Sequence, residues 1–293
     1  MVSINKFTNF NRLDIKNIFI VFLYFFKRIL KIRPNLKERS LYAYYNYLID
    51  LNGTLLEETK DAYITNFKNN FDKIIKLRKN PSSDFEVFKQ VYSLKEYLPV
   101  VNAYNANFKN KSNYSLNIID AGANIGLTSL FFTEYFEKCN SISVEPEVEN
   151  FRILEFNLQS AKKSKTVTIN GAIWSSNCKI KIINDFRDTS SWSFRVEETD
   201  DTDAITAYSI NQLLAYNNFE ILDILKIDIE GAEKQVFTDP KSNLEFLKIT
   251  RCIAIEIHDE FNCREEICNI LTDYGFVLFN EGELTIGINQ KLK

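Results

Sequence analysis

The second half of the sequence alternates short apolar segments with amphipathic ones, and this alternation constrains the fold more than any other feature. The apolar segments have the length and composition of buried strands, and the segments between them have the 3–4 spacing of helices. We expect strands at 116–120, 141–145, 166–169, 223–228 and 253–257. We expect helices at 127–137, 147–161, 210–216, 232–237 and 264–274. Strands and helices in this order predict a parallel sheet with helices on both faces.

Two segments depart from the simple alternation. Residues 276–279 and 284–288 are separated by Asn280, Glu281 and Gly282, so we expect a closing hairpin that adds one antiparallel strand. Residues 173–183 carry three polar side chains in their middle, which predicts a second hairpin.

Composition is that of a globular protein. The chain has 293 residues, of which 45% are apolar and 26% charged, which excludes collagen, coiled coil, long disorder and disulfide-rich scaffolds. A net charge of −3 is unlike that of a general nucleic-acid binder. The five cysteines are odd in number and irregularly spaced, which is typical of reduced thiols, so we expect a cytoplasmic protein.

The first 112 residues lack the strand–helix alternation. We expect them to form a helical N-terminal region, followed by one α/β domain over 113–293. Several apolar side chains recur at helical spacing between 67 and 78. They are Phe67, Phe71, Ile74 and Ile75, followed by Arg78. The polar, Asn-rich stretch 102–113 predicts the boundary loop.

Residues 12–33 predict a basic amphipathic helix. Residues 1–34 carry seven basic side chains and one acidic one, a net charge of +6. The apolar run 18–26 is shorter than the ~20 residues that span a membrane, and the basic pair after it is unlike a signal-peptide cleavage site. Three roles stay open for this helix: packing on its own domain, contact with an anionic membrane surface, and docking in a partner's groove. Five apolar side chains share one side of it: Phe19, Phe22, Phe26, Ile29 and Leu30.

The turn after the first predicted strand of the α/β domain indicates the cofactor. Gly122 permits a tight turn and Gly126 a tight helix start, at the strand edge where open α/β sheets bind ligands. Asp120 places a carboxylate at the entrance, which suits an amino group and repels a phosphate, so a dinucleotide is disfavoured. S-adenosylmethionine carries an ammonium and a sulfonium but no phosphate. The second strand ends in Glu145, which can accept hydrogen bonds from both ribose hydroxyls.

Two later strand ends carry pairs of ionisable side chains: Asp228 with Glu230, and Glu256 with His258. Residues two apart share one face of a strand, so we expect all four to converge at the ligand edge. An imidazole titrates near neutral pH and suits the role of a general base. We therefore expect His258 to be the base, Glu256 to orient it, and Asp228 to hold the substrate or the methionine end of the cofactor.

Other roles for these side chains stay open. Glu230 precedes Gly231 and is placed to stabilise the start of the next helix. His258 is the one histidine of the chain and is open to a purely structural role. In a competing mechanism, Asp228, Glu230 and Glu256 hold Mg²⁺ or Mn²⁺. We assign no residue as a metal ligand.

Four segments resemble the FkbM family of S-adenosylmethionine-dependent methyltransferases. They are IIDAGANIG at 118–126, VEP at 144–146, LKIDIEGAE at 225–233 and IEIH at 255–258. The resemblance implies a Rossmann-like class I methyltransferase fold, with a mostly parallel seven-stranded sheet and one antiparallel strand. It also implies cofactor contacts from the glycine turn, the ribose acid and the backbone after the third strand. These residues are Asp120, Gly122, Asn124, Gly126, Glu145 and Ala172.

The resemblance further implies O-methylation of a hydroxyl, for which we expect a sugar in a bacterial surface glycan. The acceptor we expect is a saccharide or another hydroxylated small molecule, not a nucleic acid. Trp192 lies in a polar segment and is a candidate for stacking on a sugar ring or for a lid. Two alternatives stay open: a nicotinamide-dependent oxidoreductase, and a non-catalytic adaptor on the inner membrane surface. We expect a cytoplasmic location, and peripheral contact with the inner membrane through the N-terminal helix stays open.

Overall fold

The computed structural model describes residues 8–68, 72–109, 113–159, 165–183, 195–199, 201 and 204–293. The chain divides into two compact units, Met1–Leu94 and Lys95–Lys293. This division lies before the boundary at 112 that the sequence suggests, because helix α4 (Leu98–Asn107) belongs to the second unit. The Tyr104 hydroxyl of α4 donates a 2.6 Å hydrogen bond to Asp223 in the central sheet.

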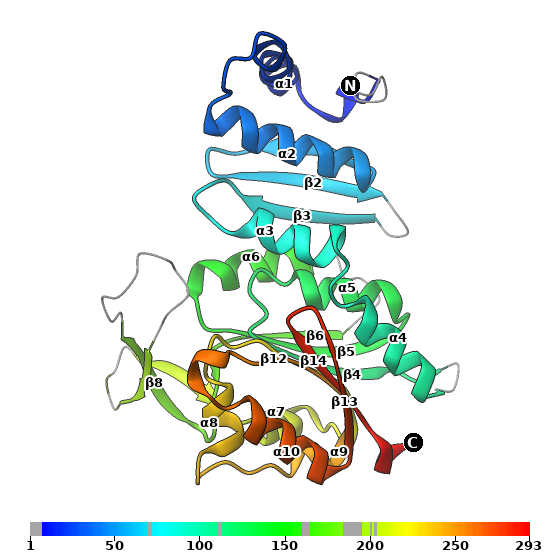
Figure 1. The fold of residues 1–293 in the computed structure, drawn as a ribbon, viewed down its shortest axis with the longest axis vertical. Coiled ribbons are helices and arrows are strands. Elements are labelled where there is room, and N and C mark those ends of the chain that lie inside the picture. Colours follow the sequence, from blue (N-terminus) through cyan, green and yellow to red (C-terminus); the bar gives the residue numbers. More distant parts are fainter. Residues whose placement is uncertain are drawn as a thin grey trace. The chain divides into compact units, whose positions relative to one another are not determined.

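The N-terminal unit combines helices with a three-stranded antiparallel sheet. After the 3₁₀ turn η2 (Phe10–Arg12) come α1 (Ile15–Ile29) and α2 (Leu36–Asp50), and α2 packs between α1 and the sheet (Figure 1). The sheet has the order β1-β2-β3, and its strands are β1 (Gly53–Glu58), β2 (Ala62–Lys68) and β3 (Asp72–Arg78). Helix α3 (Asp84–Phe88) and the π-helical turn η3 (Lys89–Ser93) complete the unit.

Helices are present in this unit as expected, but the helix predicted between 67 and 78 is wrong. Burial follows a period of two, because Lys73, Ile75 and Leu77 of β3 are buried whereas Ile74 is exposed. The 3–4 spacing arises from treating the ends of two strands as one segment. Phe71, which completed that spacing, lies outside the described residues.

Seven strands form the central sheet of the second unit, which confirms the expected fold class. Their order is β13-β14-β12-β11-β4-β5-β6. Only β14 runs antiparallel to both of its neighbours, and β13 and β14 form the predicted closing hairpin. The strand bounds are β4 (Leu116–Ala121), β5 (Cys139–Glu145), β6 (Lys165–Asn170), β11 (Leu222–Ile227), β12 (Thr250–Glu256), β13 (Phe276–Glu281) and β14 (Leu284–Asn289).

Helices cover both faces of this sheet (Figure 1). One face carries α4, α5 (Leu127–Tyr135) and α6 (Val148–Leu158). The other carries α7 (Ile210–Asn217), α8 (Glu233–Thr238), α9 (Phe246–Ile249) and α10 (Arg264–Tyr274), followed by the short 3₁₀ turn η5 (Gln290–Leu292). The apolar core between sheet and helices includes Ile119, Ile142, Leu225 and Ile253, all fully buried.

A second, four-stranded sheet flanks the first. Its order is β7-β10-β8-β9, with β7 (Ala172–Ile173), β8 (Cys178–Ile183), β9 (Arg195–Glu198) and β10 (Ile205–Tyr208). The hairpin expected over 173–183 is therefore wrong, because β10 enters between β7 and β8 and pairs with both. The sequence of residues 173–183 does not indicate that a strand beginning at residue 205 inserts between β7 and β8.

The strand order reverses between β4 and β11. From β4 the chain moves outward through β5 and β6, and from β11 it moves outward in the opposite direction. In open α/β sheets such a switch point opens a crevice at the carboxyl ends of the strands, where ligands bind. The predicted site residues lie at or just after the carboxyl ends of β4, β5, β6, β11 and β12, so they all lie at this edge.

Candidate active site

The glycine turn after β4 is wedged against the neighbouring strand ends. The backbone N–H groups of Gly122 and Ala123 both donate to the carbonyl of Val144, at 3.0 and 2.9 Å. Gly122 has a φ of +76°, and a Cβ there would lie 1.7 Å from the carbonyl oxygen of Asp228. No side chain fits in this space, so the turn brings bare backbone to the switch point.

Glu145 is held by the turn that the sequence places beside it. Its Oε2 accepts a 2.8 Å hydrogen bond from the backbone N–H of Asn124, which is in the left-handed region at φ +49°. Its Oε1 accepts from the backbone N–H of Glu147 at 3.0 Å and from the amide of Asn150 at 3.3 Å. Burial raises the pKa of Glu145 to about 7, and the N–H donors limit that rise.

Two further predicted cofactor residues lie around this carboxylate. Gly126 begins α5 with a φ of +80°, and a Cβ there would meet the side chain of Leu154 at 3.2 Å. Ala172 is buried in β7 and pairs with Ala207. It follows Gly171, whose backbone N–H donates to the Glu145 carbonyl at 3.1 Å. All these residues therefore gather at the ends of β4 and β5.

Asp120 faces a cation from this chain. The Lys226 ammonium, on the neighbouring strand in register with Asp120, lies 3.3 Å from the Asp120 Oδ1 and 3.5 Å from the Asp228 Oδ2. It also donates to the Gly122 carbonyl at 2.8 Å. Asp120 Oδ2 accepts from the Ser129 hydroxyl at 2.6 Å. Burial lowers the pKa of this lysine, but Tyr97 and the carboxylates of Asp120 and Asp228 raise it well above its usual value, so the lysine stays charged.

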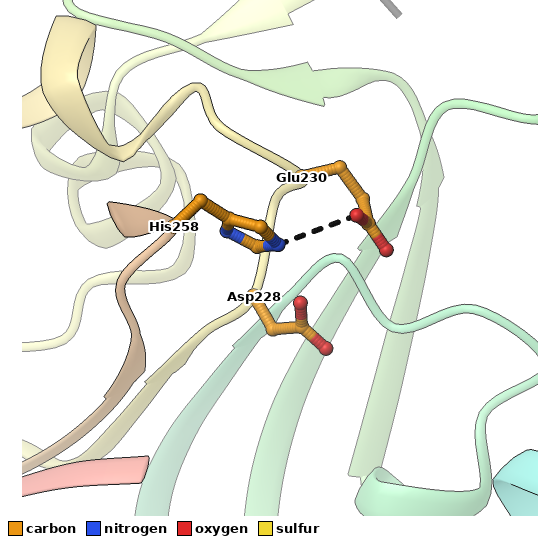
Figure 2. Close-up of side chains that lie close together, drawn as sticks. All are labelled: Asp228, Glu230 and His258. Atoms are coloured by element: carbon orange, nitrogen blue, oxygen red, sulfur yellow. Dashed lines mark ion pairs between the residues drawn. The ribbon is translucent and has the colours of Figure 1, made fainter. Parts of the chain in front are cut away.

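His258 lies between two glutamates, neither of which is Glu256. Its Nδ1 lies 3.2 Å from Glu233 Oε1, and its Nε2 lies 3.4 Å from Glu230 Oε2, as Figure 2 shows for the second pair. These contacts, the one with Glu230 first, raise the pKa of His258 to about 11. The ring is therefore an imidazolium at neutral pH, which disfavours the role of base that the sequence suggests.

The ionisable side chains at the ends of β11 and β12 also come together for a different reason than the strand spacing predicts. Strand β11 ends at Ile227 and β12 at Glu256, so Asp228, Glu230 and His258 lie beyond the strands, where the period of two no longer holds. A left-handed turn at Glu230 (φ +54°) brings its side chain toward the imidazole instead. The carboxylate in the first turn of the next helix, α8, is that of Glu233, which accepts a hydrogen bond from the backbone N–H of Ile229.

Glu256 belongs to a group of partly buried carboxyl groups. Burial, together with the negative charge of Asp228, raises the pKa of Glu256 to about 8. Burial and the charges of Asp228 and Glu283 also raise the pKa of Glu96. Glu96 and Glu256 therefore hold their protons to a higher pH than isolated carboxyl groups would.

A cation has one candidate set of ligands in the part of the chain that the structure describes. Ligand atoms of Asp228, Glu230 and His258 lie within 4.8 Å of one another (Figure 2). Both ring nitrogens of His258 already contact carboxylates, and a metal requires a neutral imidazole. Ion pairing accounts for this geometry without a metal, and the set differs from the Asp228, Glu230 and Glu256 set that the sequence suggests.

The sequence matches the methyltransferase FkbM domain over residues 120–278. The chain belongs to the FkbM methyltransferase family. The matched range contains the glycine turn, Glu145, Lys226 and the four ionisable residues at the ends of β11 and β12. Among curated proteins, none matches the sequence.

Solved structures of methyltransferases are similar to this FkbM-family chain at low identity. The methyltransferase FkbM of Methylobacillus flagellatus is 13% identical with a TM-score of 0.38, and the match covers 68% of this chain and 60% of that one. The N-terminal domain of human METTL16 in complex with SAH is 11% identical with a TM-score of 0.43, covering 87% and 83%. The precorrin-6y C5,15-methyltransferase of Geobacter metallireducens is 10% identical with a TM-score of 0.38, covering 73% and 92%.

Sequence reasoning missed two members of this FkbM-family site. Lys226 and Glu233 stand inside the LKIDIEGAE segment, yet only Asp228 and Glu230 were assigned roles there. A lysine near the end of a mostly apolar strand was the available signal, because a buried ammonium needs an acid nearby. Trp192, by contrast, lies outside the described residues.

Proposed function

We propose that the chain transfers a methyl group from S-adenosylmethionine to a hydroxyl oxygen of a saccharide or another hydroxylated small molecule. The observation that supports this best is the placement of two different sites on the two sides of one switch point. Glu145 and the glycine turn lie at the ends of β4 and β5, and the titratable cluster follows β11 and β12. A cofactor on one side can thus face an acceptor on the other.

The residues present fit the cofactor. Glu145 Oε2 accepts one hydrogen bond from the chain, so it retains capacity for a ribose hydroxyl. The Asn124 side-chain oxygen is buried and has no hydrogen-bond partner among the described residues, so it offers an acceptor to the ligand's donors. Gly122 keeps side-chain atoms out of the space next to them. The bound cofactor would supply an electrophilic methyl group, and the chain's task is to align the acceptor oxygen and take its proton.

We propose Glu256 as the group that takes the proton, in place of His258. Its pKa of about 8 lies close to the pH at which a base is most effective. His258 is instead a fixed cation between Glu230 and Glu233 that holds those two carboxylates in place. Asp228 keeps the role expected from the sequence, that of holding substrate or cofactor beside Lys226.

The choice of a sugar acceptor rests on the family resemblance alone, which is an analogy at the level of the fold. Membership in a methyltransferase family favours this function over the nicotinamide-dependent oxidoreductase and the non-catalytic adaptor. The exclusion of nucleic acid and the cytoplasmic location stay predictions. The described part of the chain contains no helix of the length and apolarity that crossing a membrane requires.

Titration calorimetry with S-adenosylmethionine and S-adenosylhomocysteine tests the cofactor. We expect micromolar affinity, about −8 kcal/mol, for the unmodified chain and a loss of at least tenfold in Glu145→Ala. The matched control is Glu149→Ala, which removes an exposed carboxylate of the same loop–helix region and should bind normally. No binding by the folded protein would overturn the proposal.

An acceptor screen follows with mono- and oligosaccharides, read by mass spectrometry of the methylated product. Each reaction is run with and without a chelator. Activity that survives chelation supports the ion-pair interpretation of the cluster, and activity that is lost and then restored by Mg²⁺ or Mn²⁺ supports the metal alternative.

A further inference from the structure

Helix α1 presents an apolar face to solvent that the proposed chemistry does not use. The helix is held on its unit by its opposite face, where Asn17, Val21 and Phe25 are buried. The exposed face contains six large side chains that are each more than half exposed, and we call it the apolar stripe. Its members are Ile15, Phe19, Phe22, Phe26, Ile29 and Leu30.

The apolar stripe includes every residue that the sequence placed on the apolar side of this helix. That side therefore does not pack on its own unit. Single exposed apolar side chains are common on soluble proteins, but a contiguous row of this size marks a binding surface for a protein or a membrane. With 15 residues, α1 is too short to cross a bilayer but long enough to lie along its surface.

The charge around the stripe is positive. Lys16 is 65% exposed beside its start, and Arg28, Lys31 and Arg33 are exposed near its end. The acidic partners are few, since Asp14 caps the helix and Glu38 pairs with Lys27. An apolar row with a basic border is the pattern of helices that lie on anionic lipid.

A cavity of about 500 Å³ begins at Lys16 and lies wholly within the N-terminal unit. Four lysines line it, and we call it the lysine pocket: Lys16, Lys37, Lys60 and Lys79. Glu58 pairs with Lys16 at 3.2 Å and with Lys79 at 2.7 Å, and among the described residues it is the one carboxylate that lines the pocket together with the four lysines. Tyr63 and Phe85 supply apolar wall. The pocket therefore suits an anion attached to an apolar body.

We propose that the N-terminal unit docks on the surface of an anionic bilayer. The apolar stripe lies at the boundary between headgroups and acyl chains, and the lysine pocket receives the phosphate of a lipid. Charge complementarity selects a membrane over a neutral protein groove, because Lys16 lies beside the start of the stripe and also lines the pocket, and both surfaces are bordered by basic side chains. This docking is independent of the proposed methyl transfer, since it concerns only residues of the N-terminal unit.

Co-sedimentation of the full chain with vesicles tests the proposal. Vesicles of phosphatidylcholine alone are compared with vesicles that also contain phosphatidylglycerol. We expect binding to the anionic vesicles that weakens as salt is raised. Phe22→Glu should lower the partition coefficient at least tenfold, and Lys60→Glu about fivefold. The matched controls are Val277→Glu, which alters a similarly exposed apolar residue of β13, and Lys89→Glu, which reverses an exposed lysine outside the pocket.

Each remaining outcome overturns the proposal. Equal binding to both kinds of vesicle would show that the lysine pocket does not select anionic lipid. No binding to either kind would show that the unit does not dock on a membrane. A dimer that light scattering detects without lipid, and that Phe22→Glu dissociates, would assign the stripe to a second copy of the chain. Because vesicle binding is read without turnover, a failure of the proposed methyl transfer leaves this result interpretable.

Discussion

The two sides of the switch point are built in different ways. At the ends of β4 and β5, backbone groups define the site: N–H groups converge on Val144 and Glu145, and Gly122 adopts a left-handed conformation. At the ends of β11 and β12, charged side chains define the site through ion pairs of Lys226 and His258. A backbone-defined site has one shape and suits a constant cofactor. A side-chain-defined site changes with single substitutions, so it suits the part of the ligand that a single substitution can select.

The largest effect is expected from Gly122→Ala, which inserts an atom between the two sides. The added Cβ would lie 1.7 Å from the Asp228 carbonyl oxygen at a φ of +76°. We expect the free energy of unfolding to fall by about 4 kcal/mol or more, measured by urea denaturation. Gly282→Ala is the control, because it has a positive φ but open space around it, and about 1 kcal/mol is expected there. Equal losses in both variants would show that the close approach is unimportant.

Removing the cation that joins the two sides should have the next largest effect. Lys226→Met leaves the buried Asp120 carboxylate without its ammonium partner, so we expect a loss of about 3–5 kcal/mol in unfolding free energy. Adding Asp120→Asn should recover part of this loss. Lys248→Met, in an exposed pair with Glu245, should cost less than about 1 kcal/mol. If the double variant is as unstable as the sum of the single ones, the pair is not the cause.

Substitution on the side-chain-defined side should alter rate more than stability. Glu256→Gln should lower kcat at least a hundredfold, about 3 kcal/mol. It should also remove the rise in rate near pH 8, which corresponds to its pKa of about 8. His258→Gln should retain that rise. The comparison is a pH–rate profile of each variant, and a rise that disappears only in His258→Gln would restore the histidine as the base.

The smallest effect concerns the backbone-defined side and is a dependence on pH. The pKa of Glu145 is raised to about 7. The contribution of this carboxyl to the free energy of unfolding is therefore fully present below its unfolded-state pKa of 4.5 and is lost as the pH rises through 7. Cofactor binding should show the opposite trend, because ribose hydroxyls donate to the ionised carboxylate. Affinity should rise about tenfold between pH 6 and 8 and become flat in Glu145→Gln, measured by calorimetry. A flat profile in the unmodified chain would contradict this.

The same contrast explains what the sequence can predict. The central sheet, the closing hairpin and the turn from Asp120 to Gly126 follow contiguous patterns, so they could be predicted from residues near in sequence. The pairing of Lys226 with Asp120 depends on the register of two strands, and that of His258 with Glu233 on a turn beyond a strand end. Neither is encoded locally. The strands β1–β3 were misjudged because apolar side chains near strand ends imitate helical spacing.

The pairing of β4 with β11 has a consequence for the order of events during folding. Lys226 and the Gly122 carbonyl that it contacts are 104 residues apart in the chain. Loop closure over that distance is slow compared with local helix formation. On the ribosome, β4, β5 and β6 emerge well before β11, so until then the early half carries an open edge at β4. That edge is the one at which the nascent chain is most exposed to pairing with the wrong strand.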